Sequence, residues 1–527
     1  MIPLTQARMK RMTAIHGWSA VLLGLLLYVV VATGATAVFA PEIGRWSVGA
    51  PRERPALEGS VDPLLRALST RVDPEFREQI AVWSGEGNDI IAAFHTQRVN
   101  PRTGEPDDFG TIFRADTVTG EILSRGDGFI WDDPAGYEES ALRQFLIDLH
   151  VQLYLPDPWG LIVTGALGLM MMAAVVTGFL MHRHMIRDLF VAERPGGRLS
   201  SVRDRHVLAS SWSLPFAFLL AFTGSFLSFA GTIGFPLLAQ VAFGGDEGAM
   251  SQALFEPPVP EDPRPVPTAD LDAILAESTA RAGAPASYLD IAHFGRADAR
   301  ITLWHDPADG ALNYTVNSFD GPRRAFLGER PEVGVIPSAG NTIYGWMSPL
   351  HFGDFAGFFS QAVWGALGVA MCFVILSGLR LWLRKRPDDP VWLRFGRATQ
   401  ITGYGLPIGM LASGYAFFLA RPAADPFFWT PLGFLLGAAA AVAIGLAIPD
   451  EDRLGRRFQR LLGGLCLLLP VIRLAMGGMT WADAVLRGQV DVLSVDLSLF
   501  VAGAALLAFA RRGPRDLAAR RIPEPAE

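Results

Sequence analysis

Residues 16–34 read HGWSAVLLGLLLYVVVATG, and residues 206–224 read HVLASSWSLPFAFLLAFTG. Each stretch is an uncharged, largely apolar run that opens on a histidine and ends on a Thr-Gly pair. A helix needs roughly 20 mostly apolar residues to cross the hydrocarbon core of a bilayer. The sequence therefore predicts two membrane-spanning helices that begin at or beside His16 and His206.

The composition of the whole chain agrees with a membrane protein. Half of the 527 residues are hydrophobic and only 18% are charged, whereas a soluble globular chain is about 25% charged. The predicted spans are residues 16–39, 158–181, 207–231, 357–380, 401–420, 428–448, 458–478 and 494–510. We expect an all-α polytopic membrane protein with about eight transmembrane helices.

Charge and cysteine content exclude several other classes of function. The net charge of -7 is modest and there is no long basic tract, so nucleic acid is not expected as a partner. The two cysteines, Cys372 and Cys466, both lie inside apolar runs. They are interpreted as small apolar fillers, which argues against a disulfide framework or a cysteine-ligated metal site.

Basic residues gather at alternate ends of the predicted spans and so predict their orientation. Cytoplasmic segments of membrane proteins carry an excess of Lys and Arg. Here that excess falls on the N-terminal tail, on the connections 182–206, 380–400 and 449–460, and on the tail after residue 510. We therefore expect a bacterial inner (cytoplasmic) membrane protein, surrounded by membrane lipid, with both termini cytoplasmic.

Two long segments are left on the external side of the membrane. Residues 41–149 and 232–350 are too long to be loops without secondary structure. In the first, 62–69 is helix-like, 90–96 and 111–115 are strand-like, and a turn is expected at 116–120. In the second, a helix is expected at 269–282, strands at 300–304 and 312–317, and turns at 307–310 and 320–321. Each segment is predicted to form a small periplasmic α+β domain.

The expected division of the chain follows from these elements. It runs as helix one (1–40), the first external domain (41–149), helices two and three (150–231), the second external domain (232–350), helix four (351–390), and helices five to eight with a cytoplasmic tail (391–527).

The first four spans contain an internal repeat of helix, external α+β domain and helix. His16 precedes Gly34, and His206 precedes Gly224, by the same eighteen residues. In the other half of the unit, Leu149-His150 precedes the span with Thr177-Gly178, and Leu350-His351 precedes the span with Ser377-Gly378. Repeats of this kind are common in membrane proteins. The repeat makes the four histidines equivalent in pairs.

These histidines suggest haem. Ionisable groups at membrane depth are candidates for function, and a neutral imidazole can bind iron while its other nitrogen is hydrogen-bonded. His16, His182 and His206 are predicted near the cytoplasmic face, and His150 and His351 near the external face. We expect two b-type haems, one in each leaflet.

The axial positions are assigned by layer. His150 and His351 are expected to serve the external haem together. Three candidates compete for the inner haem, because the repeat pairs His16 with His206 whereas His182 has no repeat partner. Small residues beside the histidines leave room for a macrocycle or allow close helix contacts; they are Gly17, Gly24, Ser210, Ser213, Gly357 and Gly365.

The other histidines are expected to have structural roles. His95, His293 and His305 lie in the external domains, and His184 lies on a different helical face from His182. No glycine-rich nucleotide loop is convincing, so a separate electron donor is required, either a quinol or a cytoplasmic reductase.

At this point the chain resembles the PepSY-associated transmembrane proteins, a family that includes iron-regulated membrane proteins and ferric-siderophore reductases. The resemblance covers about the first 390 residues. It is carried by His16-Gly17-Trp18, Thr33-Gly34, Leu149-His150, Pro158-Trp159-Gly160, Thr177-Gly178 with His182, Asp204-Arg205-His206, Thr223-Gly224, the run from Leu350 to Gly357, and the "D-x-x-T-G-E" element from Asp116 to Glu121.

The resemblance implies two periplasmic PepSY-like domains and haem held by His16, His150, His182, His206 and His351. It implies reduction of a ferric siderophore or other ferric chelate at the periplasmic face, with release of ferrous iron. Spans five to eight lie outside the basic four-span form of the family. The rival hypothesis is a non-enzymatic scaffold or transporter subunit whose PepSY domains bind peptides or regulate a protease.

Overall fold

The computed structural model of the protein describes residues 5–49, 56–58, 60–102, 104, 106–132, 137–181, 198–255, 260–308, 311–335, 337–386 and 388–511. The chain divides into two compact units. The helical unit comprises Met1–Gly49, Ser140–Phe222 and Gly365–Glu527, and the sheet unit comprises Ala50–Glu139 and Thr223–Trp364. The division therefore falls within two of the long helices.

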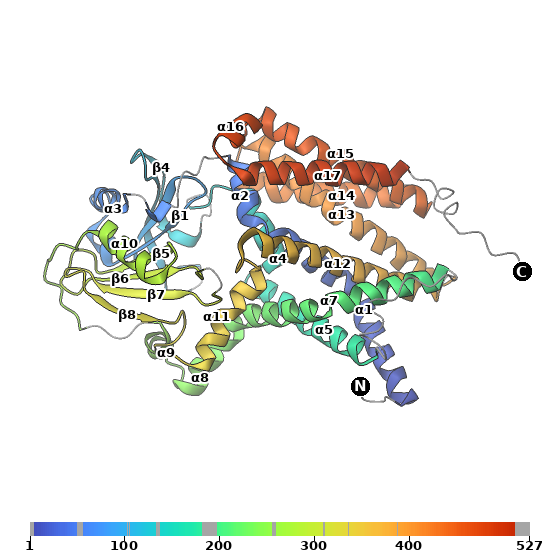
Figure 1. The fold of residues 1–527 in the computed structure, drawn as a ribbon, viewed down its shortest axis with the longest axis horizontal. Coiled ribbons are helices and arrows are strands. Elements are labelled where there is room, and N and C mark those ends of the chain that lie inside the picture. The colour runs from blue at the N-terminus through green and yellow to red at the C-terminus, as the bar shows by residue number, and fades with distance from the viewer. Residues whose placement is uncertain are drawn as a thin grey trace, which may run out of the picture. The chain divides into compact units, whose positions relative to one another are not determined.

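Among the described residues, eight helices are long and apolar enough to cross a membrane, which confirms the predicted number. They are α1 (Gln6–Ala37), α5 (Trp159–Met181), α7 (Arg198–Phe229), α12 (Gly357–Arg384), α13 (Pro390–Ala420), α14 (Pro426–Ala447), α15 (Glu451–Ala475) and α17 (Val490–Arg511) (Figure 1). Helix α7 continues through a π-helical turn at Ala230–Gly234 into α8 (Phe235–Ala242).

Two helices begin earlier in the sequence than predicted, because capping residues precede their apolar parts. Helix α13 was expected to begin at residue 401, but Asp389 caps it by accepting a hydrogen bond from the Val391 amide, 2.8 Å away, and Pro390 occupies its first turn. Asp450 caps α15 in the same way. An N-cap carboxylate and a proline at the first helical position both favour helix initiation. Hydropathy locates only the apolar part of such helices.

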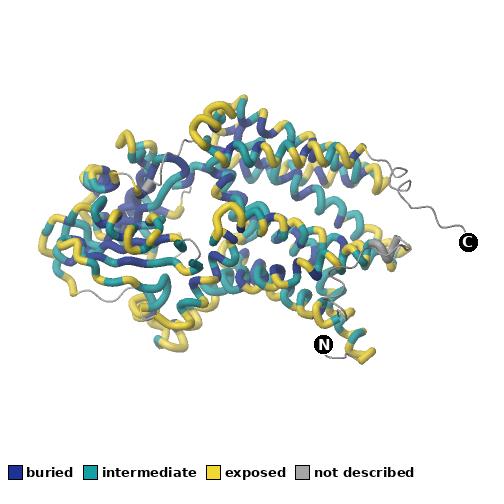
Figure 2. Tube along the Cα trace, viewed as in Figure 1, coloured by how far each residue is buried: buried dark blue, intermediate teal, exposed yellow. Residues whose placement is uncertain are grey.

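Large apolar side chains cover the outer faces of these helices. Leu22 is 70% exposed, Leu446 73% and Phe359 76%, and Figure 2 shows exposed positions recurring along the helices. A soluble monomer rarely exposes a large contiguous apolar surface. Lipid hydrocarbon accounts for this surface, and the protein is therefore a membrane protein.

The sheet unit is built on one eight-stranded antiparallel sheet with the order β4-β3-β2-β1-β5-β6-β7-β8. Its strands are β1 (Gln79–Ser84), β2 (Asp89–Val99), β3 (Pro106–Asp116), β4 (Ile122–Phe129), β5 (Ala286–Ala292), β6 (Arg300–His305), β7 (Thr315–Asp320) and β8 (Phe326–Arg330). The two segments that were predicted as separate domains thus share a sheet, because β1 pairs with β5 between them.

Two helices cover one face of this sheet, α3 (Val61–Ser69) and α10 (Leu271–Ala282). Their leucines pack on alternate strand residues such as Ile80 and Val82, whereas Ala81 and Trp83 point to the opposite face. Successive side chains of a strand point to opposite faces. The period-two pattern of the sequence therefore fixes which residues meet the helices.

The two covering helices cap one another. The Asp62 carboxylate accepts from the Leu271 amide at 3.1 Å, and the Asp272 carboxylate accepts from the Val61 and Asp62 amides at 2.7 and 3.1 Å. The first amides of a helix have no partner within the helix. Each helix thus supplies the cap that the other needs, which fastens the two segments together beside the β1–β5 pairing.

The predicted turn at residues 116–120 is present between β3 and β4. Asp116 accepts from the amides of Val118 and Thr119 at 2.8 and 2.7 Å. Gly120 follows with a φ of +72°, a conformation that glycine adopts without strain. The predicted turn at 307–310 includes residues 309 and 310, which lie outside the described residues.

In the helical unit, a buried ion pair fastens the last helices to a short helix that follows α1. Arg473 on α15 and Asp496 on α17 are 0% and 2% exposed, and their side chains lie 2.6 Å apart. Asp496 also accepts from the indole nitrogens of Trp46 on α2 (Ala40–Val48) and Trp481, at 2.7 and 2.8 Å. Both carboxylate oxygens are therefore occupied.

Apolar packing joins the same helices to α4 (Ala141–Val151). Leu142, Phe145 and Leu149 of α4 form one core with Phe417 and Phe418 of α13 and with residues of α15 and α17. The additional four spans thus brace α4, which carries His150.

We expect Asp496→Ala to destabilise the protein by about 3–5 kcal/mol, because it leaves the Arg473 charge buried without its counter-ion. The measurement is the thermal midpoint of the detergent-solubilised protein. Asp491→Ala is the matched control, since Asp491 pairs with Arg45 at a partly exposed position on the same helix and should cost at most about 1 kcal/mol. The double variant Arg473→Met with Asp496→Leu should recover only the part of the loss that comes from the unpaired charge, because the Trp46 and Trp481 indoles still lack their acceptor. A wild-type midpoint for Asp496→Ala would contradict this account.

Candidate functional site

His16 lies in the first third of α1, against the end of α5. Its Nδ1 is 3.0 Å from the carbonyl oxygen of Ala174 and 3.3 Å from the hydroxyl of Thr177. The Thr177 hydroxyl is already within bonding distance of the Ala173 and Ala174 carbonyls. A carbonyl can only accept, so His16 donates from Nδ1.

His206 on α7 makes the same contacts with α12. Its Nδ1 lies 3.1 Å from the carbonyl oxygen of Val374 and 3.0 Å from the hydroxyl of Ser377. Ser377 occupies the place that Thr177 has on α5, immediately before a glycine. The two contacts are therefore built alike from residues that the sequence repeat relates.

His150 and His351 lie on short helices outside the predicted spans and follow the same rule. Nδ1 of His150 is 3.0 Å from the Val30 carbonyl oxygen and 3.4 Å from the Thr33 hydroxyl of α1. Nδ1 of His351, on α11 (Ala339–Phe352), is 2.9 Å from the Thr223 hydroxyl of α7. All four imidazoles thus meet a Thr/Ser-Gly pair on a neighbouring helix.

The glycine of each pair lets the imidazole approach the helix backbone. A Cβ placed on Gly34 would lie 2.7 Å from the His150 ring, and one on Gly224 would lie 2.9 Å from His351. The corresponding distances are 3.1 Å for Gly378 with His206 and 3.5 Å for Gly178 with His16. Carbon atoms in contact are normally about 3.5–4.0 Å apart. Side chains at the first three positions would therefore displace the histidines.

These hydrogen bonds decide which ring nitrogen is available for chemistry. An imidazole that donates from Nδ1 to a carbonyl carries its lone pair on Nε2. Metal-binding histidines usually have this arrangement, in which the outer hydrogen bond fixes both the tautomer and the orientation of the ring. Burial lowers the pKa of His150, opposed by the bond to the Val30 carbonyl. The buried ring is therefore held in the neutral form that binds metal.

The helical unit brings His16 and His206 together. They lie near enough for the charge of one imidazole to act on the other. His150 instead bonds to Val30, fourteen residues beyond His16 on α1, which at 1.5 Å per residue is about 21 Å along the helix. Histidines thus lie at two separate levels along α1. His16 and His206 form one level, and His150 lies at the other.

One predicted site residue, His182, cannot be assigned to these levels, and neither can its neighbour His184, which was not expected to bind haem. His182 and His184 lie outside the described residues. The expectation that His150 and His351 serve one haem stays a prediction, because the two residues belong to different units.

Besides His351, the sheet unit contains three histidines, and these have structural partners. His305 is fully buried and lies 2.7 Å from the Ser278 hydroxyl and 2.8 Å from the Ala284 carbonyl oxygen. His293 pairs with Asp298 at 3.1 Å, and His95 with Asp108 at 3.2 Å. Within the described ranges, no group of three or more His, Cys, Asp or Glu side chains could hold a metal ion.

Three of the six small residues singled out from the sequence serve helix packing. Modelling a Cβ on Gly17, Gly24 or Gly365 brings it against Trp382, Leu379 or Phe39, at 2.6, 3.3 and 2.7 Å. The glycines that receive the histidines are those of the Thr/Ser-Gly pairs. The sequence showed their regular spacing from the histidines, but it did not show that each histidine meets the pair of another helix.

A tryptophan cluster beside His16 was not predicted. Trp382 packs against Gly17, and its ring centre lies 5.1 Å from that of Trp18 and 5.7 Å from that of Trp392. The Arg386 guanidinium lies over the Trp382 ring at 3.8 Å. Trp382 lies four residues after Gly378, as His182 lies four after Gly178, which could have drawn attention to it.

We expect Gly34→Ala to lower the thermal midpoint of the protein, because the new methyl group would press on the His150 ring at 2.7 Å. Gly178→Ala is the matched control. Its methyl group would meet His16 at an ordinary 3.5 Å, and alanine stabilises a helix by up to about 1 kcal/mol relative to glycine. The two variants should therefore shift the midpoint in opposite directions, or Gly178→Ala should leave it unchanged. Equal shifts would show that the glycines do not receive the imidazoles.

Comparison with known proteins identifies the family of the chain. The family model described as "PepSY-associated TM region" matches residues 13–385. The chain is 29% identical over 382 residues to "Uncharacterized protein PA4219" of Pseudomonas aeruginosa, an alignment that covers 69% of this chain and 92% of the relative. The matched region contains every histidine of the two levels and ends before α13. The chain therefore belongs to the PepSY-associated transmembrane family.

Proposed function

We propose that the protein is an inner-membrane di-haem b-type electron carrier that reduces a ferric siderophore or another ferric chelate at the periplasmic face and releases ferrous iron. The observation that carries the proposal is the repeated histidine contact. Four imidazoles each meet a Thr/Ser-Gly pair through Nδ1. For His16, His150 and His206 a backbone carbonyl also accepts from Nδ1, so that Nε2 carries the lone pair that an axial ligand needs.

The residues fit a haem better than another metal centre. Two imidazoles on different helices can bind one iron from opposite faces, and histidine is a common axial ligand. The described side chains offer no cluster of three or more ligands for a bare metal ion. His16 and His206, both in the helical unit and within electrostatic reach of one another, are the pair that would hold the inner haem, with His182 as the third candidate. His150 and His351 would hold the outer one.

Haem b supplies a centre that accepts and gives up one electron, with a potential tuned by axial ligands and burial. The chain's own part is to orient the imidazoles, keep them neutral and place them at two levels about 21 Å apart along α1. The hydrocarbon core of a bilayer is about 30 Å thick. Haems at these two histidine levels would therefore support electron transfer across most of the hydrocarbon core.

The predicted topology gives the direction of transfer. The excess of Lys and Arg in the connections supports a topology with both termini in the cytoplasm. In that topology the sheet unit would lie in the periplasm, where a chelate too large to cross the membrane would arrive. The iron of that chelate would gain one electron and pass from the ferric to the ferrous state. The donor is a separate partner, a quinol or a cytoplasmic reductase.

We expect the purified protein to be coloured and to show a Soret band that shifts on addition of dithionite. His206→Ala, His150→Ala and His351→Ala should each remove about half of the haem per protein, because each takes one axial ligand from one of two sites. The measurement is the pyridine haemochrome spectrum. His293→Ala is the control, since His293 pairs with Asp298 in the sheet unit and should leave the haem content unchanged.

Colourless protein would overturn the proposal in favour of a scaffold or transporter subunit. Unchanged haem in both His150→Ala and His351→Ala would remove the outer site alone. For the inner site, Ala variants of His16, His182 and His206 should divide into two severe losses and one mild loss.

The direction of electron flow has its own test. Adding a ferric chelate to the dithionite-reduced protein, freed of excess reductant, should reoxidise it and colour the ferrous trap ferrozine. The expected yield is one ferrous ion for each electron that the protein held. A reduced protein that no ferric chelate oxidises, but that a quinone does, would instead be a quinone-linked carrier.

A further inference from the structure

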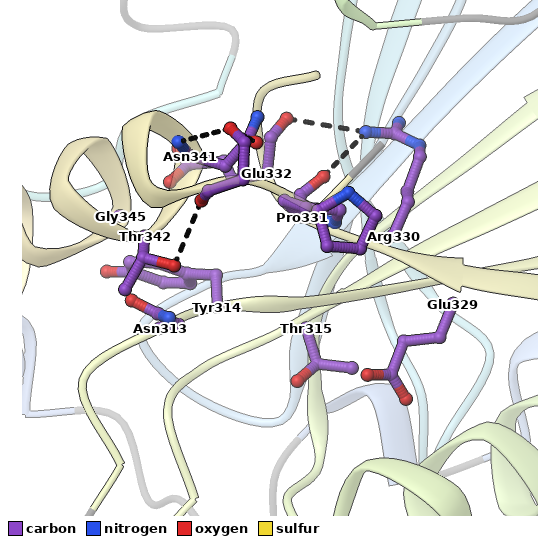
Figure 3. A pocket seen from close by; sticks show the side chains of 12 residues that line it. Asn313, Tyr314, Thr315, Glu329, Arg330, Pro331, Glu332, Asn341, Thr342 and Gly345 are labelled. Carbon is purple, nitrogen blue, oxygen red and sulfur yellow. Dashed lines mark hydrogen bonds between the residues drawn. The ribbon is translucent and has the colours of Figure 1, made fainter. Parts of the chain in front are cut away.

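The sheet unit contains a polar pocket that the proposed electron transfer does not use. It has a volume of about 240 Å³ and lies between the β7–β8 pair and the first half of α11 (Figure 3). Tyr314 lines it ahead of β7, Glu329 and Arg330 at the end of β8, Glu332 beyond that strand, and Asn341 on α11. Drug-sized ligands occupy about 300–1,000 Å³, so this pocket suits a small molecule or one arm of a larger one.

Glu332 gives the pocket its chemical character. Its Oε2 atom is buried and has no hydrogen-bond partner among the described residues. Burial raises the pKa of Glu332. A buried carboxylate oxygen without a partner is costly. Because Glu332 also lines the pocket, a cation bound there would lower the cost of its charged form.

The charges around the pocket favour a cation. Tyr314 and Glu332 line the same pocket. The pKa of Tyr314 is raised first by burial and then by the negative charges of Asp354, Asp306 and Glu332. A carboxylate beside an aromatic ring suits an ammonium group, which gains both a charge-assisted hydrogen bond and a cation–π contact.

The groups in the pocket that could attract an anion are already engaged. Nη1 of Arg330 lies 3.1 and 3.3 Å from the carbonyl oxygens of Pro331 and Glu332, and its guanidinium lies over the Trp304 ring at 5.7 Å. A helix N-terminus favours negative charge, but Ser338 caps α11 by accepting from the Asn341 amide at 3.2 Å. The Asn341 side chain in turn donates to the Val333 carbonyl.

We propose that this pocket binds a primary ammonium group, carried by a small amine or by the amine-bearing arm of a larger ligand, with Glu332 as its counter-ion and the Tyr314 ring beside it. This assigns the sheet unit a cation-binding site. The assignment does not depend on haem.

The test is a saturation-transfer NMR titration of the full-length, detergent-solubilised protein with n-pentylammonium. The wild type should bind n-pentylammonium saturably, and at least about tenfold more tightly than pentan-1-ol or pentanoate. Glu332→Gln keeps the shape of the side chain and removes its charge, so it should weaken n-pentylammonium binding by about tenfold. Glu329→Gln is the matched control, because Glu329 lines the same pocket from an exposed position, and it should change the affinity by less than about twofold.

Three outcomes would overturn the proposal: equal binding of n-pentylammonium by Glu332→Gln and the wild type, equal binding of pentanoate and n-pentylammonium, or no saturable binding. If Glu332→Gln fails to fold, the relative affinities of the wild type for n-pentylammonium, pentan-1-ol and pentanoate still test whether the pocket prefers an ammonium group. Haem content is measured on the same samples. A colourless protein that keeps the ammonium preference would reject the proposed electron transfer alone, and a coloured protein without the preference would reject only the pocket.

Discussion

The hydrogen bond from a histidine Nδ1 to an adjacent helix is the constraint on which the candidate site depends. Inside a span each backbone carbonyl is already engaged by its own helix, so an imidazole can share one only where the helix surface is open. Glycine opens that surface, and the preceding Thr or Ser places a hydroxyl oxygen beside the same ring. The pair thus positions the imidazole, and for His16, His150 and His206 the backbone carbonyl also determines the tautomer and so leaves the lone pair on Nε2.

Helices α13, α14, α15 and α17 follow the residues that the family model matches, and they support the histidine contacts through α2 and α4. They contribute to the core that holds α4, on which His150 lies, and the Arg473–Asp496 pair ties them to α2 through Trp46. A buried ion pair is weak evidence for stability by itself, but it enforces a particular partner, since an unpaired buried charge is heavily penalised. The added helices therefore hold α2 and α4 in a defined position relative to α1.

The sheet unit shows how two distant segments become one structure. Each contributes a helix and four antiparallel strands, and the first strands of the two segments pair. An unpaired edge strand is exposed to unwanted pairing with other chains. Because β1 and β5 pair with each other, only β4 and β8 remain as edge strands of the sheet. Reciprocal capping by Asp62 and Asp272 ties the covering helices together at the same junction.

The sequence by itself determined the number of spans, the histidine repeat, the turn at Asp116 and the helix or strand character of most elements, because hydropathy, periodicity and turn chemistry are local properties. It could not determine that His16 meets Gly178 while Gly34 meets His150, nor that the two external segments share a sheet. It also gave no sign that Asp496 accepts from both Arg473 and Trp46. Those facts were decided by the tertiary structure, because they depend on which surfaces of separate helices and strands come together. Residues on separate elements carry no local signal of their contact, whether they lie 23 positions apart, as Arg473 and Asp496 do, or 450, as Trp46 and Asp496 do.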